Sequence, residues 1–402
     1  MSKKNVPMLR FEGFSDDWEQ RKLINFTKLI TKGTTPKNKT GSGEVNFVKV
    51  ENLSDGKISP IQKITEEEHE GYLKRSRLQE DDILFSIAGT LGRTAIVTKS
   101  ILPANTNQAL AIIRNYDFDK DFLITTLTGH VVTEYIRKNP TVGAQPNLSL
   151  EQVGKLIINT PSEEEQQKIG IFFKQFDDTI ALHQRKLEQL KRLKQGFLQG
   201  LFANEATVPK LRFAGFTEEW EQRKLGDITE SFSGGTPTAG KSEYYGGDIP
   251  FIRSGEISSE LTELFITENG LNNSSAKMVK VGDILYALYG ATSGEVSISR
   301  INGAINQAIL AIRPTKNDNS YLIVQWLRKQ KDTIISTYLQ GGQGNLSGSI
   351  VKDLVITLPQ DKEEQNKIGA FFKQLDDTIT LHQNKLSQLK KLKKALLQSM
   401  FI

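Results

Sequence analysis

The sequence contains an internal duplication with a period of about 200 residues. VPMLRFEGFSDDWEQRKL (6–23) returns as VPKLRFAGFTEEWEQRKL (208–225), identical at 13 of 18 positions, and 163–202 returns as 362–401, identical at 27 of 40. Between these conserved ends the two copies share only short stretches. Because the period far exceeds that of solenoid repeats, each copy is expected to be a domain plus a connector.

Composition limits the class of protein. With 402 residues and 37% hydrophobic content, the chain is expected to form two to four packed domains. It has neither a long apolar stretch nor the apolar core of a signal peptide, so we expect a soluble, cytoplasmic protein. The absence of cysteine excludes disulfides, thiolate zinc sites and cysteine nucleophiles. A net charge of +5 permits polyanion binding without indicating it.

Short β-rich runs recur in the same order within each copy and predict two α+β globules. The paired runs are NFVKV and IPFIRS, DILFSIA and DILYALY, TAIVT and EVSIS, LAIIR and LAIRP, and KLIINTP and DLVITLP. One helix is expected to interrupt them in each copy, at 122–139 and 320–338. We expect globular domains at 1–160 and 206–358, with long helices at 161–205 and 359–402.

The two 40-residue segments show the 4-3 spacing of a coiled coil. Eight of the ten seam positions of the first segment are apolar, and the other two are His183 and Lys194; His382 and Lys393 stand at the same places in the second. Acidic residues lead each helix, as the helix dipole favours. Nearly identical helices within one chain are expected to pair with each other, antiparallel around a pseudo-twofold axis, as a rigid spacer.

Several kinds of catalytic chemistry find no support. An adenine methyltransferase needs an acidic or amide residue before Pro-Pro and an aromatic, and no Pro-Pro pair occurs. The four histidines, His69, His130, His183 and His382, lie far apart in sequence. The pairs Asp177-Asp178 and Asp376-Asp377 are expected on solvated helix surfaces. Trp18 and Trp220 are expected to anchor the opening segment in each core.

Gly235–Ser242 reads GTPTAGKS and satisfies the phosphate-loop pattern G-x-x-x-x-G-K-[ST]. That pattern binds phosphates only where a strand leads through the loop into a helix. Gly246, Gly247 and Pro250 follow and would break a helix, and the first copy lacks the G-K-[ST]. We therefore favour a polar surface loop over an ATPase site.

The motifs together resemble the specificity (S) subunit of type I restriction-modification systems. They are the LRFxGFxxxWEQRKL openings, the GDILY-type strand, the NQA turn, the NLS before the last strand, and EEQxKIGxFFKQxDDTIxLHQxKLxxLKxLK. The resemblance covers essentially the whole chain. It implies two target-recognition domains that each read one half of a bipartite DNA sequence, with an antiparallel coiled coil that fixes the gap.

The resemblance also implies a complex. Two modification subunits would carry S-adenosylmethionine and methylate adenine, and two restriction subunits would carry ATP-driven translocation with Mg²⁺ and cleavage. The chain itself would be non-catalytic, hold no cofactor or metal, and bind double-stranded DNA without a membrane. A DNA-independent scaffold and an ATPase remain as alternatives.

Candidate DNA contacts are polar and basic residues of the loops, because base edges are read by hydrogen-bonding side chains and phosphates by Lys and Arg. In the first copy they are Lys32, Thr34, Thr35, Lys37, Lys39, Arg93, Gln145 and Asn147. In the second copy they are Thr236, Thr238, Lys241, Tyr244, Tyr245, Arg253, Gln343 and Asn345. Asn147 and Asn345 recur in both copies and could instead shape a turn.

Overall fold

The computed structural model describes residues 6–37, 41–54, 56–60, 62–139, 147–203, 206–339 and 345–401. The chain divides into two compact units: the first unit joins Met1–Gln184 to Asn384–Ile402, and the second unit is Arg185–Gln383. Each unit therefore holds one globule, the part of one long helix next to that globule, and the facing part of the other long helix. Both ends of the chain belong to the first unit.

The first unit is built on an antiparallel sheet of order β2-β10-β7-β8, with a second sheet of order β6-β3-β9. Its strands are β1 (Glu19–Lys22), β2 (Thr27–Lys32), β3 (Val45–Val48), β4 (Leu53–Ser54), β5 (Lys57–Ile58), β6 (Gln62–Ile64), β7 (Ile83–Ser86), β8 (Thr94–Ile96), β9 (Ala104–Thr106), β10 (Leu110–Tyr116) and β11 (Ile157–Thr160). Its short helices are η1 (Leu23–Phe26), η2 (Val50–Asn52), α1 (Glu66–Glu70), η3 (Lys74–Ser76), η4 (Lys99–Ile101), α2 (Lys120–Thr128), α3 (His130–Lys138) and α4 (Leu150–Gly154).

The second unit repeats this plan with sheets of order β13-β20-β17-β18 and β15-β14-β19-β16. Its strands are β12 (Glu221–Lys224), β13 (Thr229–Ser233), β14 (Tyr245–Ile252), β15 (Leu264–Ile266), β16 (Lys277–Val279), β17 (Ile284–Ala287), β18 (Val296–Ile298), β19 (Gly303–Ile305), β20 (Ile309–Pro314) and β21 (Val355–Leu358). Its short helices are α6 (Leu225–Ile228), η5 (Ser242–Tyr244), η6 (Ser254–Glu256), α7 (Glu268–Asn272), α8 (Ser320–Tyr338) and α9 (Gly348–Asp353). The predicted α+β duplication is confirmed.

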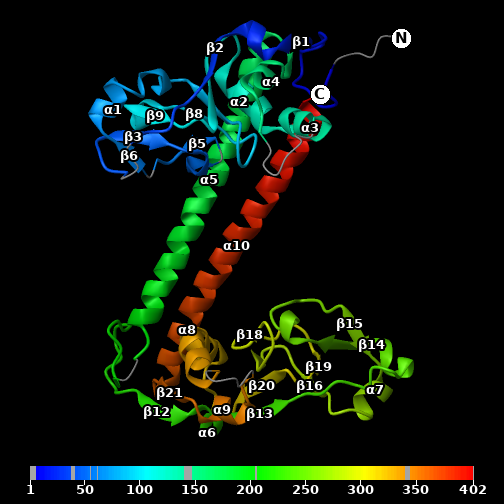
Figure 1. Ribbon diagram of the computed structural model, residues 1–402. Coiled ribbons are helices and arrows are strands. Elements are labelled where there is room, and N and C mark those ends of the chain that lie inside the picture. The colour runs from blue at the N-terminus through cyan, green and yellow to red at the C-terminus, as the bar shows by residue number, and fades with distance from the viewer. Residues whose placement is uncertain are drawn as a thin grey trace. The chain divides into compact units, whose positions relative to one another are not determined.

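The central strand of each main sheet is buried on both faces, because successive side chains of a strand point to opposite sides. In β7, Ile83 and Phe85 pack into the core with α2 and α4, while Leu84 packs into a separate core. In β17, Tyr286 packs into one core of the second unit, and its neighbour Leu285 packs into another. In Figure 1 the sheet that contains β3 lies with α1 in the first unit, and the sheet that contains β14 lies with α7 in the second, in each case away from the helices that cover the other sheet.

The helix expected at 122–139 is in fact two helices, and that prediction was wrong. α2 ends at Thr128 and α3 begins at His130, with Gly129 in an extended conformation between them. The hydroxyls of Thr125, Thr126 and Thr128 donate to backbone carbonyls of the same helix. Gly and hydroxyl residues both weaken a helix, whereas α8 runs unbroken over the predicted 320–338.

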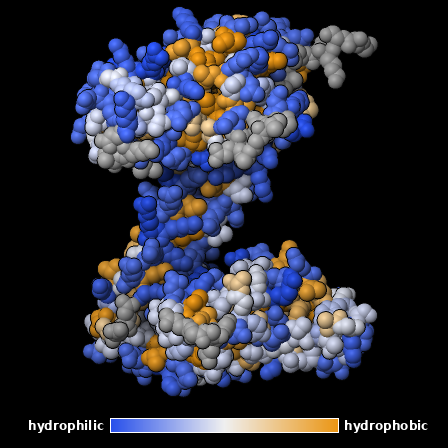
Figure 2. Space-filling view, viewed as in Figure 1, coloured by the Kyte–Doolittle hydropathy of each residue, from blue (hydrophilic) through white to orange (hydrophobic). Residues whose placement is uncertain are grey.

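Two long helices, α5 (Glu163–Gly200) and α10 (Lys362–Met400), carry the predicted seam. They pack antiparallel within each unit: Phe173 lies 5.8 Å from Phe401 in the first, and Phe197 lies 4.8 Å from Phe371 in the second, between ring centroids. Hydrophilic residues dominate the face of the long helices seen in Figure 2, as expected for helices that bury one stripe.

The seam lysines meet carboxylates of the facing helix. Lys194 Nζ lies 2.7 Å from Asp376 Oδ1, and Lys393 donates to Asp177. The side chain of Asp376 is 18% exposed and that of Asp177 is 34% exposed. The prediction of solvated carboxylates was therefore wrong for these two residues, because each compensates a lysine in the seam.

The opening segment of each copy packs back onto its own unit. Trp18 and Trp220 are buried, as predicted. Arg10 forms two hydrogen bonds, of 2.6 and 2.7 Å, to the carboxylate of Glu165 at the start of α5. Arg212 does the same to Glu364 at the start of α10, at 2.7 and 2.8 Å. Both carboxylates are buried, so each pair fixes an opening segment to a long helix.

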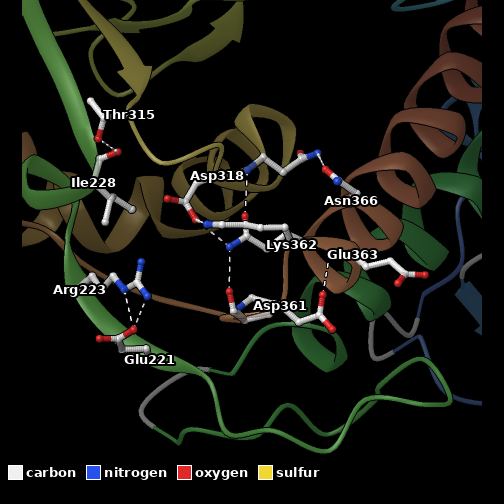
Figure 3. A network of polar contacts seen from close by, with 12 residues as sticks. Glu221, Arg223, Ile228, Thr315, Asp318, Asp361, Lys362, Glu363 and Asn366 are labelled. Atoms are coloured by element: carbon white, nitrogen blue, oxygen red, sulfur yellow. Dashed lines mark hydrogen bonds and ion pairs between the residues drawn. The ribbon is translucent and has the colours of Figure 1, made fainter.

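The start of α10 is also tied to the loop before α8 (Figure 3). Lys362 donates to Asp318, and Gln365 Nε2 donates to the same Oδ1 atom at 2.7 Å. The Asn319 backbone N–H donates to Gln365 Oε1 at 2.9 Å, and its side chain reaches Asn366. These contacts position the second globule on its helix.

Candidate functional site

Two polar clusters occupy equivalent places in the two units, and we call them the rims. The first rim is Thr35, Ala88, Gln108 and Asn147; the second rim is Thr236, Tyr289, Gln307 and Asn345. Thr35 Oγ1 donates to Gln108 Oε1, and Thr236 Oγ1 donates to Gln307 Oε1 at 2.5 Å. Ala88 forms a β-bridge with Asn147, and Tyr289 forms one with Asn345.

Local backbone bonds explain why the rims recur. The Thr34 N–H donates to Thr106 O at 2.9 Å, and the Gly235 N–H donates to Ile305 O at 3.1 Å, so each glycine-threonine loop runs along the end of a strand. Asn107 and Asn306 accept from the N–H two residues on, at 3.2 and 3.1 Å, and so shape the NQA turn.

Each rim contains two predicted residues: Thr35 and Asn147 in the first, and Thr236 and Asn345 in the second. They also contain Gln108 and Gln307, which are exposed and were not among the candidates. The NQA turn, shared by both copies, was the sequence signal for them. Each rim presents amide and hydroxyl groups from separate loops, which suits hydrogen bonding to the edges of bases.

The remaining candidates of the first unit lie outside the first rim. Lys32 is exposed at the end of β2, and Lys37 Nζ lies 4.6 Å from the ring centroid of Tyr72. Arg93 is exposed between β7 and β8 and lines a cavity beside the long helices. Lys39 and Gln145 lie outside the described residues, as does Gln343 of the second unit.

The phosphate-loop string of the second unit leads into a strand. A single 3₁₀ turn, η5, separates it from β14, so the predicted lack of a following α-helix is confirmed. Lys241 Nζ donates to the hydroxyl of Tyr244 at 3.0 Å, and its backbone N–H bonds to Thr238 O at 3.1 Å. Tyr245 donates to Pro237 O at 2.6 Å.

Two candidates of the second unit mainly support its loops. Tyr244 is only 6% exposed. Arg253 bonds to Glu256 at 2.9 and 3.0 Å and to Glu263 at 2.6 Å. The bond from Arg253 lowers the pKa of Glu256 to about 2, against the effect of burial. The positive charge of Arg253 is therefore compensated within the loop.

No group of His, Cys, Asp or Glu suited to a metal ion occurs among the described residues. Within the same part of the chain, no helix is long and apolar enough to cross a membrane. His183 and His382 are half-buried in the seam of the long helices.

Comparison with known proteins assigns the duplicated chain to a family. The model of the type I restriction modification DNA specificity domain matches twice, at residues 15–192 and 217–391. The chain is 25% identical to the putative type I restriction enzyme MjaX specificity subunit of Methanocaldococcus jannaschii, over 95% of this chain and 92% of that protein. It is 22% identical to the HindI specificity subunit of Haemophilus influenzae, over 64% of this chain and 72% of that one.

A solved structure agrees with this assignment at the level of the fold. The crystal structure of the type I restriction-modification S subunit from M. genitalium has a TM-score of 0.70 at 15% identity, and covers 99% of both chains. Since the two family matches together span most of the sequence, the chain belongs to the family of type I restriction-modification specificity subunits.

Proposed function

We propose that each unit reads one half of a bipartite DNA target, with its rim facing the bases. DNA-sequence specificity is the property of the family to which the chain belongs. The observation that carries the proposal is that two equivalent rims of Thr, Gln and Asn differ in chemistry at one position. Where the first rim has Ala88, the second has Tyr289, whose side chain hydrogen-bonds Gln307. Two unlike reading surfaces suit two unlike half-sites.

In this proposal the rim amides read base edges and the surrounding cations hold phosphates. Gln108 and Gln307 suit bidentate contact with adenine, and Thr35 and Thr236 orient them. The lysines of the loops, Lys32, Lys37, Lys39 and Lys241, would neutralise phosphates. Thr34, Thr238, Tyr245, Arg93, Gln145 and Gln343 are proposed as further contacts, while Tyr244 and Arg253 would support the loops that carry them.

Paired substitutions test the assignment of rims to half-sites. Gln307→Ala should cost about 1–3 kcal/mol on the cognate site and relax one base of one half-site, leaving the other half intact. Gln108→Ala is the matched control and should relax the opposite half. The readout is the methyladenine pattern of cells that carry each variant. Equal weakening on every sequence would reject base reading by these residues.

We further propose that the long helices set the gap between half-sites and help dock the modification subunits. A 38-residue helix such as α5 spans ~57 Å at ~1.5 Å per residue. Four residues inserted after Gln189 add ~6 Å and form a stutter that a coiled coil absorbs. The preferred gap should lengthen by roughly one or two base pairs, at ~3.4 Å each.

A two-residue insertion at the same place is the control, because it rotates later seam residues away and should abolish assembly. Methylation of a plasmid library with gaps from about four to twelve base pairs reads out both variants. An unchanged preferred gap in a folded, active four-residue variant would exclude the helices as the spacer.

The partners and cofactors belong to the same proposal. Two modification subunits would bring S-adenosylmethionine and methylate adenine, and two restriction subunits would bring ATP and Mg²⁺. The chain would be a non-catalytic, cytoplasmic subunit. Native mass spectrometry of the copurified complex tests the stoichiometry. Binding of S-adenosylmethionine by the chain alone would contradict the division of labour.

Salt dependence separates this function from a DNA-independent scaffold. Several lysines would release counterions from phosphates, so log affinity should fall steeply with log salt concentration. The measurement is gel retardation of plasmid DNA by the chain with its modification subunits. An affinity that stays flat from low to moderate salt would favour the scaffold.

A further inference from the structure

Hydrogen bonds hold the globule of the second unit to α10 along the length of α8. Asp376 of α10 is 18% exposed and accepts three of them. The donors are Tyr321 at 2.7 Å, Gln325 at 2.9 Å and Arg328 at 3.2 Å, which lie about one turn apart on α8. Because bonds to a charged group are stronger than bonds between neutral groups, this row resists separation of α8 from α10.

Both α8 and its counterpart α2 in the first unit begin with the same contact to a long helix. Asp119 and Asn319 are the N-caps of α2 and α8, and their side chains accept from the backbone N–H three residues on. Their own N–H groups donate to Gln166 Oε1 and Gln365 Oε1, at 3.0 and 2.9 Å. We call this contact the joint of each globule.

The joints are closely packed as well as hydrogen-bonded. Gly170 of α5 and Gly369 of α10 lie against the N-cap side chains, so that an added Cβ would clash with them. In the first unit the ring of Phe122, in the first turn of α2, stacks on Phe401 with 5.8 Å between centroids. Each globule is therefore held firmly at the start of its helix.

Beyond the joint, α2 differs from α8. Counted from the N-caps, the three donor positions of α8 correspond to Asp121, Thr125 and Thr128. An ionised carboxylate has no hydrogen to donate, and the two threonine hydroxyls donate to backbone oxygens of α2 itself, at 2.6 and 2.9 Å. The carboxylate of α5 that corresponds to Asp376 is Asp177, which accepts from Lys393 of α10. These three residues of α2 therefore supply no donor to it.

A cavity of about 840 Å³ lies beside α2 in the first unit. Its lining includes Thr125 and Thr128 from α2 and Lys174 and Asp177 from α5. Cations and carboxylates of the lining compensate one another, and a polar cavity of this size is filled by water in solution. Water does not hold two helices at one separation, so the cavity leaves α2 room to move relative to α5.

The ion pair between Lys57 of β5 and Asp178 of α5 also links the first globule to its long helix. Their charged atoms lie 3.5 Å apart, and both side chains are more than half exposed. A pair this exposed adds little stability, because water screens its charges. It is therefore a much weaker restraint than the buried row of α8.

We propose that Tyr321, Gln325 and Arg328 are positioning residues that hold the second globule at one angle on α10, whereas the first globule turns about its joint. The consequence for DNA rests on the proposed function, in which the globules read the two half-sites. A first globule that turns follows its half-site over a small range of gaps. The row of α8 thus limits the gap tolerance of the complex to what the first globule supplies.

Pulsed electron paramagnetic resonance on the full chain tests the difference in restraint. The chain contains no cysteine, so introduced cysteines place spin labels only at the chosen positions. Glu66→Cys with Gln175→Cys reports the first globule against α5, and Glu268→Cys with Gln374→Cys reports the second against α10; all four positions are exposed. The distance distribution should be broader for the first pair. Equal widths, or a broader second pair, would overturn the proposal.

Removal of the donors tests the role of the row itself. Tyr321→Phe with Gln325→Met and Arg328→Met keeps the side-chain sizes, and Lys194 still compensates Asp376, so the variant should stay folded. The distance distribution of the second label pair should broaden. Amide exchange in the later turns of α8 should accelerate about tenfold or more, because bonds to a charged group are lost.

The reciprocal variant supplies the donors to the first unit. Asp121→Tyr with Thr125→Gln and Thr128→Arg places them opposite Asp177 and should narrow the distribution of the first label pair. Thermal melting identifies which triple variants are folded. An unchanged width in a folded triple variant would contradict the assignment, and either variant alone suffices for this test.

Methylation of the gap library by the complex with modification subunits tests the consequence. The donor-removal variant should accept gaps about one or two base pairs further from the preferred one, and the reciprocal variant should accept fewer gaps than the unaltered chain. The bases read in each half-site should stay the same, whereas an unstable globule would lose methylation at every gap. Widths that respond without a change in accepted gaps would overturn the role in gap tolerance. Failure of the unaltered complex to methylate a bipartite site would instead count against the proposed function, and the measurements on the chain alone would stand.

Discussion

Replacing Asp376 with alanine removes an acceptor that Lys194, Tyr321, Gln325 and Arg328 share. Lys194 is 17% exposed, so its buried ammonium would lose the carboxylate that compensates it. Breaking such a buried pair typically costs about 3–5 kcal/mol, and partial exposure places the expected loss near ~3 kcal/mol. For a unit of this size that corresponds to a drop in Tm of about 6–12 °C.

Asp177→Ala is the matched control, because it removes the equivalent carboxylate of the first unit. Asp177 is 34% exposed and bonds to Lys393, so solvent screening reduces the expected loss to about 1 kcal/mol. Differential scanning calorimetry of the full chain should show the larger shift for Asp376→Ala. Equal shifts for the two variants would refute the view that the second globule is anchored through Asp376.

The loss of stability caused by Asp376→Ala is expected to depend on pH. Burial acts to raise the pKa of Asp376, but the hydrogen bonds from Lys194, Tyr321 and Gln325 outweigh it, and the pKa is lowered. A lowered carboxylate pKa contributes stability above the unfolded value of about 3.9, and this stability is lost as the pH falls through the folded pKa. Denaturation at several pH values should show the Asp376→Ala deficit shrink only below about pH 4.

Three further predictions use the same structure. Arg10→Ala should destabilise the first unit and Arg212→Ala the second, by about 3 kcal/mol each, because each variant leaves a buried glutamate without its partner. Calorimetry that assigns both losses to one unit would contradict this. Phe401→Ala should lower the stability of the first unit by about 2–4 kcal/mol, because its ring packs on Trp18, and limited proteolysis should then cut that unit first. Lys241→Ala should leave the ATPase of a complete complex intact, and loss of that activity with DNA binding preserved would reinstate the phosphate-loop reading.

The long helices and the opening segments could be predicted from sequence, because the patterns that specify them are local or occur in both copies. The seam of α5 and α10 follows a fixed spacing, and the two copies support each other at the opening segments. The break at Gly129 was missed because a helical run tolerates one glycine in sequence terms. Three threonine hydroxyls just before Gly129 donate to backbone carbonyls, and these bonds weaken the helix further and favour two helices.

The sites could be predicted only in part, since they depend on contacts between distant segments. Thr35 and Thr236 were candidates, but their partners Gln108 and Gln307 lie more than 70 residues away. The role of Asp376 also escaped prediction, because its donors come from α8, about 50 residues earlier. A position on a helix surface does not reveal which other helix will cover it.

The central claim is that the two units read DNA independently on one frame. Its most direct measurement is the genome-wide methyladenine pattern after residues 26–158 are replaced by the equivalent segment of another family member. The openings and the long helices stay unaltered in this exchange. We predict a bipartite motif in which one half changes, while the other half and the gap remain. A change in both halves, or a motif without two parts, would contradict the account.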